Sequence, residues 1–475
     1  MSSRCDVPAG RPFLTGGAMT LEGFARAHKS NVGYLDVAAN SHGAEKGLLL
    51  RRALCRVQNA EPKAVEVGPG GGAAVSYLAS HLGADDIGTL HLTLVEAPGV
   101  VSQSLSLAVE QFNQAGGTCV LRHGLAQDIG SILSGPADVI SASALLHEVY
   151  SYGGGYSGLH AMMRTLPTVL RPYGFFVYRD VYAVASPSLH ERAIQSYDAL
   201  AWLQFMRMFV PQYLREGTHP YHHASDDILA RQNSRIVPVG ELDVNTCVFV
   251  VAPIGLFREI QRHYITFRDH VWRSGVLGFT PILDGQLAHD WVDFKRGHKR
   301  AHYTLTEADW LPRSQKASLL AMSEAYGDHY TIDSDILDEV TDVALTTFLA
   351  AAENGDTACA EVWMSWLARE GRETYAYLTT DELLTAFAVN SADSDSETVL
   401  MPVQDGDIFR AERNYYNRFL TKRLANPLTD AKQLVLFQNI PLSDETALRR
   451  ALDSVQDHCG KSNLARAYTA INSRR

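Results

Sequence analysis

A glutamate and three glycines that follow it at two-residue intervals are the residues of this sequence best suited to hold a ligand. They are Glu66, Gly68, Gly70 and Gly72, within residues 64–74. Glycines at a turn leave backbone N–H groups free and let a ligand approach closely, because no Cβ stands in the way. A carboxylate just before such a turn suits a cationic group. The pattern therefore predicts a binding site for a ligand that carries a positive charge.

A strand and a helix must hold this turn in place. Residues 64–67 are a short apolar run typical of a buried strand, and residues 75–82 are typical of the first turns of a helix. A strand–turn–helix unit directs the positive end of the helix toward a ligand lying over the turn. An ordinary strand-to-helix turn without a ligand is the alternative.

The turn fits two cofactor patterns. Gly68, Gly70 and Ala73 satisfy the dinucleotide pattern G-x-G-x-x-G/A. With Glu66 included, the acid-x-Gly-x-Gly-x-Gly run resembles motif I of the class I S-adenosylmethionine-dependent methyltransferases. A carboxylate suits the cationic methionyl end of S-adenosylmethionine and sits poorly against a pyrophosphate. The resemblance implies S-adenosyl-L-methionine as the cofactor, with Glu66 and the three glycines around its methionyl end.

Further cofactor contacts are expected at the ends of the next strands. Residues 89–96 predict a second strand that ends in Glu96, and an acid at this spacing binds ribose hydroxyls in doubly wound sheets. Glu96, with Ala97 after it, suits either nucleotide cofactor. The resemblance places the adenine at Leu125 and Ala126, after a third strand, and a further contact at Ser141 in the fourth strand.

Two adjacent residues after the fourth strand are the predicted catalytic groups. Residues 137–143 predict a central parallel strand, which runs into His147 and Glu148. In the small-molecule O-methyltransferases that the sequence resembles, a histidine at a similar place acts as general base on a hydroxyl. Glu148 would orient His147. A histidine packed on a helix without a catalytic role is the alternative.

Four residues are predicted to contact the substrate. Tyr34 and His42 belong to an N-terminal segment of the kind that folds over the cofactor or substrate in such methyltransferases. Tyr152 begins a glycine loop, and Asp180 ends a predicted fifth strand. That strand follows a Leu-Arg-Pro-Tyr-Gly step, which resembles the family step L-[K/R]-P-G-G except that Tyr173 replaces the first glycine.

The predicted fold is α/β: a doubly wound, Rossmann-like methyltransferase sheet with a helical N-terminal cover and a large, mostly helical or mixed C-terminal domain. We predict a helical N-terminal segment at 1–60 and an S-adenosylmethionine-binding domain at 61–255, with a helical insertion at 184–232. A C-terminal accessory domain follows at 256–475. Residues 234–238 and 246–252 are predicted to supply the antiparallel hairpin that completes the sheet in this family.

Composition bounds the classes of function. The chain has 475 residues, 46% of them hydrophobic, and a net charge of −11, which disfavours a large nucleic-acid surface. It contains no apolar run of about 18 residues and no signal-peptide pattern at its start. Six scattered cysteines without a C-x-x-C pair predict free thiols and no zinc site. We therefore expect a cytoplasmic enzyme without a metal or membrane association.

The sequence as a whole predicts a class I S-adenosylmethionine-dependent methyltransferase, a transferase acting on a small-molecule substrate such as those of secondary metabolism. Transfer of another group of the cofactor, such as its aminocarboxypropyl chain, is an alternative, because the glycine motif does not identify the carbon that is attacked. An NAD-dependent oxidoreductase and a non-catalytic binding module are the others. N-terminal helical extensions often support dimers, so a homodimer is one expected assembly.

Overall fold

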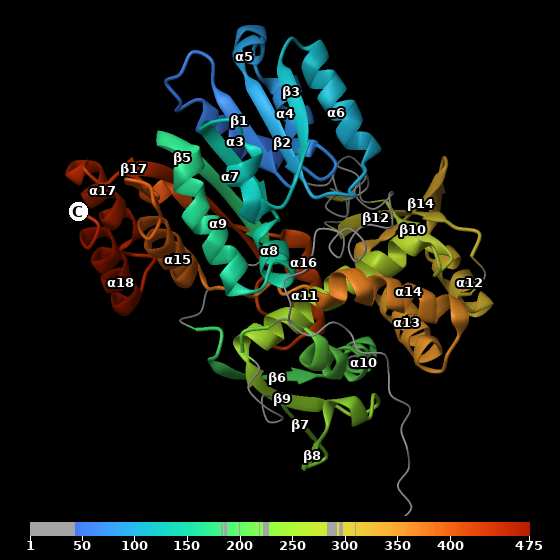
Figure 1. Ribbon diagram of the computed structural model, residues 1–475. Helices are drawn as coiled ribbons and strands as arrows, with labels where there is room; N and C mark the ends of the chain where they lie inside the picture. Colours follow the sequence, from blue (N-terminus) through green and yellow to red (C-terminus); the bar gives the residue numbers. More distant parts are fainter. Residues whose placement is uncertain are drawn as a thin grey trace, which may run out of the picture.

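The structure is a computed structural model that describes residues 43–181, 184, 188–198, 200–217, 219–221, 228–282, 292–293, 298–308 and 310–475. Tyr34 and His42 lie outside the described residues, as does most of the predicted N-terminal segment. The described part contains a unit built on a large sheet and a largely helical unit, one above the other in Figure 1. Within that part, no helix combines the length and the apolar character needed to cross a membrane.

The large sheet begins with five parallel strands in the spatial order β3-β2-β1-β4-β5. The chain extends the sheet from β1 first in one direction and then in the other, so the direction changes between β1 and β4. Ligands bind beyond the carboxyl ends of the strands at such a switch point. The doubly wound arrangement is the predicted one. The strands are β1 (Lys63–Val67), β2 (His91–Glu96), β3 (Thr118–His123), β4 (Ala137–Ser143) and β5 (Leu170–Val181).

Helices cover both faces of this sheet, and each face has its own apolar core. In α6, for example, Leu105, Ala108 and Phe112 recur at helical spacing and are buried, which gives the helix one apolar side. One face carries α3 (Gly43–Leu54), α4 (Ala73–His81) and α6 (Gln103–Gln114). The other carries α7 (Ile129–Ile132), α8 (Leu146–Tyr152) and α9 (Tyr156–Val169), while α5 (Ala84–Thr89) leads into β2.

The C-terminal end of the chain completes the sheet. Strand β17 (Ala431–Pro441) runs antiparallel to β5, from Lys432 opposite Val181 to Gln438 opposite Phe175. Strands β15 (Thr398–Met401) and β16 (Ile408–Glu412) pair with β17 in turn. Helices α15 (Thr380–Ala392), α17 (Glu445–Val455) and α18 (Lys461–Asn472) add to the core on the face that holds α9. The sheet therefore draws on residues from both sides of the predicted boundary at 255.

The predicted hairpin was wrong. Residues 234–238 and 246–252 contribute β8 (Arg235–Val237) and β9 (Val248–Pro253) to a separate antiparallel sheet in the order β6-β9-β7-β8. The burial patterns explain the difference. Strand β9 buries mainly alternate residues, whereas nearly every residue of β17 is buried, as a strand covered on both faces requires. The small sheet is completed by β6 (Arg192–Tyr197) and β7 (Leu229–Gln232).

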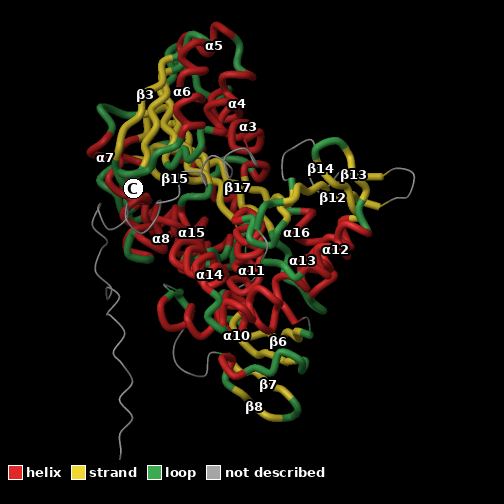
Figure 2. Tube along the Cα trace, turned by 90° about the vertical axis from the view of Figure 1, so that its right-hand side faces the viewer, coloured by secondary structure: helices red, strands yellow, loops and turns green. Residues whose placement is uncertain are grey.

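The helical unit lies between the large sheet and the small one, as Figure 2 shows. Its core is rich in aromatic side chains, with Trp202, Trp272 and Trp366 fully buried. The main helices are α10 (Leu200–Glu216), α11 (Ile254–Ser274), α12 (Arg313–Ala321), α13 (Ser334–Glu353), α14 (Thr357–Arg369) and α16 (Asn414–Arg423). A further antiparallel sheet holds β10 (Phe279–Pro281), β11 (Val292–Asp293), β12 (His298–Leu305), β13 (Glu324–Tyr326) and β14 (His329–Asp333).

Candidate active site

The glycine turn between β1 and α4 has the backbone that its sequence predicts. Gly68, Gly70 and Gly72 have φ angles of 68°, 57° and 77°, in the left-handed region that side chains disfavour. A Cβ on Gly72 would lie 2.8 Å from the Cβ of Ala108 in α6. The turn therefore needs glycine at Gly72 both for its backbone angle and for the close approach of α6.

Glu66 lies at the carboxyl end of β1 with an unsatisfied oxygen. Its side chain is buried, with 1% exposure, and Oε2 has no hydrogen-bond partner among the described residues. Burial raises the pKa of Glu66 to about 7, with Lys46 acting in the opposite direction. Buried carboxylate oxygens normally have a hydrogen-bond partner. A cationic ligand bound over the glycine turn would provide the partner that Oε2 lacks among the described residues.

Glu96, at the end of β2, is fixed to the same turn. One carboxylate oxygen accepts a hydrogen bond from the N–H of Gly70 at 3.1 Å, and the other accepts one from the N–H of Ala97 at 2.9 Å. The side chain is 2% exposed. Two backbone donors hold the carboxylate in one orientation. The structure therefore brings Glu66, Glu96 and the turn together at one end of the sheet.

The other predicted cofactor residues lie on neighbouring strands. Leu125 and Ala126 follow β3, whose last residue His123 is paired with Glu96 in the parallel register. Ala126 begins the short 3-10 helix η2 (Ala126–Asp128) and is buried. Ser141 is opposite Glu66 in the register of β1 and β4. All of these residues are thus at or near the carboxyl ends of β1 to β4.

Asp180, rather than Glu148, is the carboxylate that orients His147. The Nδ1 atom of His147 lies 2.7 Å from Oδ1 of Asp180, and the backbone N–H of His147 donates to Oδ2 at 3.0 Å. Asp180 was predicted from the sequence as a substrate contact. Burial by itself would lower the pKa of His147, but the carboxylates of Asp180 and Glu373 outweigh it and raise the pKa to about 9. Asp180 therefore favours the protonated form of His147 and fixes the orientation of its ring.

Sequence reasoning missed a third wall of the site, which residues 373–377 supply. Glu373 Oε2 lies 3.6 Å from His147 Nε2, and the Tyr375 hydroxyl donates to Glu373 at 2.8 Å. The Tyr377 hydroxyl donates to Asp180 Oδ2 at 3.1 Å. These residues alternate along the segment between η4 (Glu370–Arg372) and α15. That two-residue alternation of Glu373, Tyr375 and Tyr377 was the only local signal in the sequence.

Lys46 connects the cofactor side of the site with His147. It lies on α3, and burial lowers its pKa while the nearby carboxylates of Glu66 and Glu148 act to raise it. The neighbouring Glu45 accepts hydrogen bonds from Arg179 at 2.9 Å and Lys432 at 2.5 Å, which ties α3 to β5 and β17. Helix α3 thus brings a buried lysine close to the carboxylates of Glu66 and Glu148.

Tyr152 is the remaining predicted substrate residue that the structure describes, and it is buried near Glu373 and Glu148. Its hydroxyl donates to the backbone oxygen of Arg369 at 2.9 Å, so it joins α8 to α14. The five described cysteines are free thiols, as predicted.

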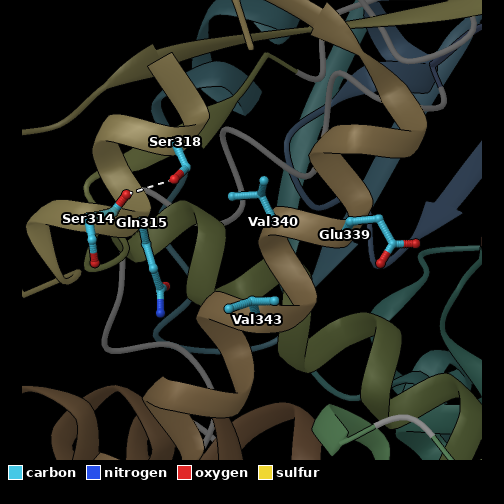
Figure 3. A pocket seen from close by; sticks show the side chains of 6 residues that line it. All are labelled: Ser314, Gln315, Ser318, Glu339, Val340 and Val343. Carbon is cyan, nitrogen blue, oxygen red and sulfur yellow. Dashed lines mark hydrogen bonds between the residues drawn. The ribbon is translucent and has the colours of Figure 1, made fainter. Parts of the chain in front are cut away.

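A hollow of about 270 Å³ lies apart from this site, between α12 and α13 (Figure 3). Its walls carry hydroxyls, an amide, two valines and one carboxylate, and none of the predicted residues. They are Ser314, Gln315, Ser318, Glu339, Val340 and Val343.

Comparison with known proteins gives likenesses of part of the fold. No protein-family model and no curated protein sequence matches the chain. Similar solved structures include YjhP from E. coli, with 16% identity over 35% of this chain and 59% of that one, at a TM-score of 0.22. An S-adenosylmethionine-dependent methyltransferase from Clostridium acetobutylicum has 13% identity over 34% and 60%, at a TM-score of 0.24. The CurJ carbon methyltransferase has 14% identity over 47% and 58%, at a TM-score of 0.26.

In these three comparisons the chain spans 58% to 60% of the length of the solved proteins. At such identities the likeness concerns the fold alone.

Proposed function

We propose that this protein binds S-adenosyl-L-methionine and transfers its methyl group to a small molecule. The observation that carries the proposal is the orphaned oxygen of Glu66 beside the left-handed glycine turn. A buried carboxylate oxygen without a hydrogen-bond partner among the described residues favours a ligand that donates to it, and the ammonium group of the methionyl end is such a donor. Bound S-adenosylmethionine supplies a methyl group already activated by its sulfonium centre.

The contacts of Glu96 support the nucleoside end of the same site. Its carboxylate accepts from Gly70 and Ala97, one bond on each oxygen, and is thereby held at the carboxyl end of β2, where an acid binds ribose hydroxyls in doubly wound sheets. Since Glu96 ends the strand next to β1, a ribose held there lies one strand away from a methionyl group at Glu66. The spacing of these two carboxylates suits an adenosyl ligand with a cationic tail.

The acceptor would bind between α8 and residues 373–377. The carboxylate of Asp180 fixes the orientation of His147, so the Nε2 edge of the imidazole faces Glu373. Leu145 links this region to the turn, since a Cβ on Gly68 would lie 3.0 Å from Leu145 Cδ1. Orienting the acceptor against an activated methyl group accounts for most of the rate in a displacement of this kind.

Calorimetric titration with S-adenosylmethionine, S-adenosylhomocysteine and NAD tests the proposal. We expect micromolar binding of both adenosyl ligands to the wild-type protein, at least tenfold weaker binding to Glu66→Gln, and no binding of NAD. Glu61→Gln, an exposed glutamate just before β1, is the matched control and should bind like the wild type. Binding of NAD alone would contradict the proposal, and so would adenosyl binding that Glu66→Gln leaves intact.

Product analysis separates methyl transfer from transfer of the aminocarboxypropyl chain. Methyl transfer leaves S-adenosylhomocysteine, whereas loss of the aminocarboxypropyl chain leaves methylthioadenosine. We expect S-adenosylhomocysteine when the protein turns over with an acceptor. If methylthioadenosine is the only adenosyl product, the proposed cofactor site is supported and the proposed methyl transfer is contradicted.

A further inference from the structure

One imidazole and two carboxylates converge at the acceptor side of the site. His147, Glu148 and Glu373 each offer one donor atom, and the three atoms lie within 4.8 Å of one another. Glu148 follows His147 on α8, while Glu373 comes from the segment that returns from the helical unit. His147 and Glu373 are at least 95% buried, and Glu148 is half-buried. The donors therefore meet in a largely buried part of the protein.

The separation of two of these donors is close to that of two ligands of one ion. His147 Nε2 and Glu373 Oε2 are 3.6 Å apart, which is longer than a hydrogen bond. Two donors that each bind one ion at about 2.0–2.2 Å in tetrahedral or octahedral geometry stand about 3.0–3.5 Å apart. A small inward shift of the two side chains would bring them to that spacing.

The groups behind the donors have the arrangement that supports metal ligands. A histidine that binds a metal through one ring nitrogen usually donates its other N–H to a carboxylate, which fixes the ring. Asp180 provides that carboxylate at 2.7 Å from Nδ1 of His147. Ligating carboxylates are hydrogen-bonded in turn. The hydroxyl of Tyr375, at 2.8 Å from Oε2 of Glu373, provides that bond.

We infer that His147, Glu148 and Glu373 bind one divalent transition-metal ion, of the Mn²⁺ or Zn²⁺ type. Nitrogen and oxygen donors without sulfur suit these ions, and three protein ligands leave coordination positions open for another molecule. If the acceptor binds beside His147 as proposed, it would take the open positions, so the acceptor class is a molecule with an oxygen donor, such as a hydroxyl or a carboxylate. That last step rests on the proposed function, whereas binding of the ion does not.

The test is calorimetric titration of chelator-treated, dialysed full-length protein with Mn²⁺ and, separately, Zn²⁺. We expect one saturable site, and a loss of affinity of at least tenfold in Glu373→Gln and in Glu148→Gln. Asp180→Asn, which keeps all three donors, should weaken binding by about 10–100-fold, as changes behind metal ligands do. Glu361→Gln, at an exposed glutamate on α14, is the control and should bind the ion like the wild type.

Two results would overturn the inference. One is the absence of a saturable site in the wild-type protein for both ions. The other is equal affinity in wild type, Glu373→Gln and Glu148→Gln, which would place the ion elsewhere. Glu148 is half-buried, so its variant decides the matter if Glu373→Gln does not fold. Titration of the same samples with S-adenosylmethionine tests the proposed cofactor binding separately from binding of the ion.

Discussion

Asp180 holds His147 by both its side chain and its backbone: one carboxylate oxygen lies 2.7 Å from Nδ1, and the other accepts the backbone N–H at 3.0 Å. The two residues come from β5 and α8, so the pair fixes the start of α8 against the end of the sheet. The Tyr377 hydroxyl adds a contact from the other side of the carboxylate. The ring of His147 is therefore held in one orientation by three parts of the chain.

Breaking this pair should be costly for stability. We expect Asp180→Ala to lower the free energy of unfolding by about 3–5 kcal/mol, because it leaves a buried charged partner uncompensated. Asp393→Ala removes an exposed ion pair with Arg164 and should cost less than about 1 kcal/mol. Urea unfolding at pH 7 measures both. Equal and small effects would show that the buried pair adds no more than a surface pair.

The affinity for S-adenosylmethionine should rise with pH because of Glu66. Its pKa of about 7 means that the carboxylate is mostly protonated at pH 6.0 and mostly ionised at pH 7.5. Since the cationic ligand requires the ionised form, we expect roughly eightfold tighter binding at the higher pH. The range stops at pH 7.5 because α-amino groups lose their proton from about pH 7.7. Calorimetry on Glu66→Gln should give a flat profile, and a wild-type profile equally flat would contradict the assignment.

Glu66 should also make the stability of the unliganded protein depend on pH. A carboxyl group whose pKa is raised on folding favours the folded state below its unfolded value of 4.5, and this contribution is lost as pH rises through about 7. We therefore expect Glu66→Gln to be more stable than the wild type at pH 8, by a few kcal/mol, and about equally stable at pH 4.5. Urea unfolding at the two pH values checks the sign.

Gly72 should not tolerate a side chain. Gly72→Ala combines a φ angle of 77° with a Cβ placed 2.8 Å from Ala108, so we expect a loss of about 2–4 kcal/mol. Gly116→Ala is the control, since its φ is 101° but no atom lies within 4 Å of the added Cβ. Gly116→Ala should lower the free energy of unfolding by only about 1–2 kcal/mol, which is the cost of the positive φ angle without a steric clash. The double change Gly72→Ala with Ala108→Gly should recover part of the difference, because the added Cβ would still lie 3.2 Å from the Cα of Leu105. No recovery would contradict the packing explanation.

Cutting the chain at residue 255 should leave an unfolded N-terminal piece. Strand β17 covers the edge of β5 along seven paired residues, and it lies in the other piece. Exposed apolar strand edges aggregate. We expect residues 43–255 made alone to be insoluble, and soluble when made together with residues 256–475. Circular dichroism and gel filtration measure the outcome, and a soluble, folded 43–255 piece would show that β17 is dispensable.

Local patterns predicted where Glu66, Glu96 and the glycine turn lie in the fold, because each of them lies next to a strand end that its own segment specifies. Glu66 and Glu96 close apolar runs, and the glycines between them fix the turn. Tyr173 replaces the first glycine of the family step L-[K/R]-P-G-G. Its φ angle is 64°, in the left-handed region that glycine normally occupies, so the backbone of the step is kept although the residue differs. The Tyr173 hydroxyl donates to Asp444 at 3.0 Å, which helps to hold it.

The residues that surround His147 could not be predicted from local patterns in the same way. Glu373 and Tyr377 reach His147 only after the chain has passed through the whole helical unit, so no local spacing relates them to α8. The choice between Glu148 and Asp180 as partner of His147 also depended on tertiary structure. Sequence proximity favoured Glu148, but the parallel pairing of β4 with β5 brings Asp180 to the start of α8.

The position of β17 has a consequence for synthesis of the protein. On the ribosome, β5 is complete once Val181 has emerged, but its partner strand starts only at Ala431. At about 5–20 residues per second, roughly 12–50 s of translation separate the two. During that interval the helical unit can assemble while the edge of β5 waits unpaired. The nascent chain therefore exposes the unpaired edge of β5 until residues 431–441 are made, and we expect chaperones that bind extended apolar strands to protect it during that interval.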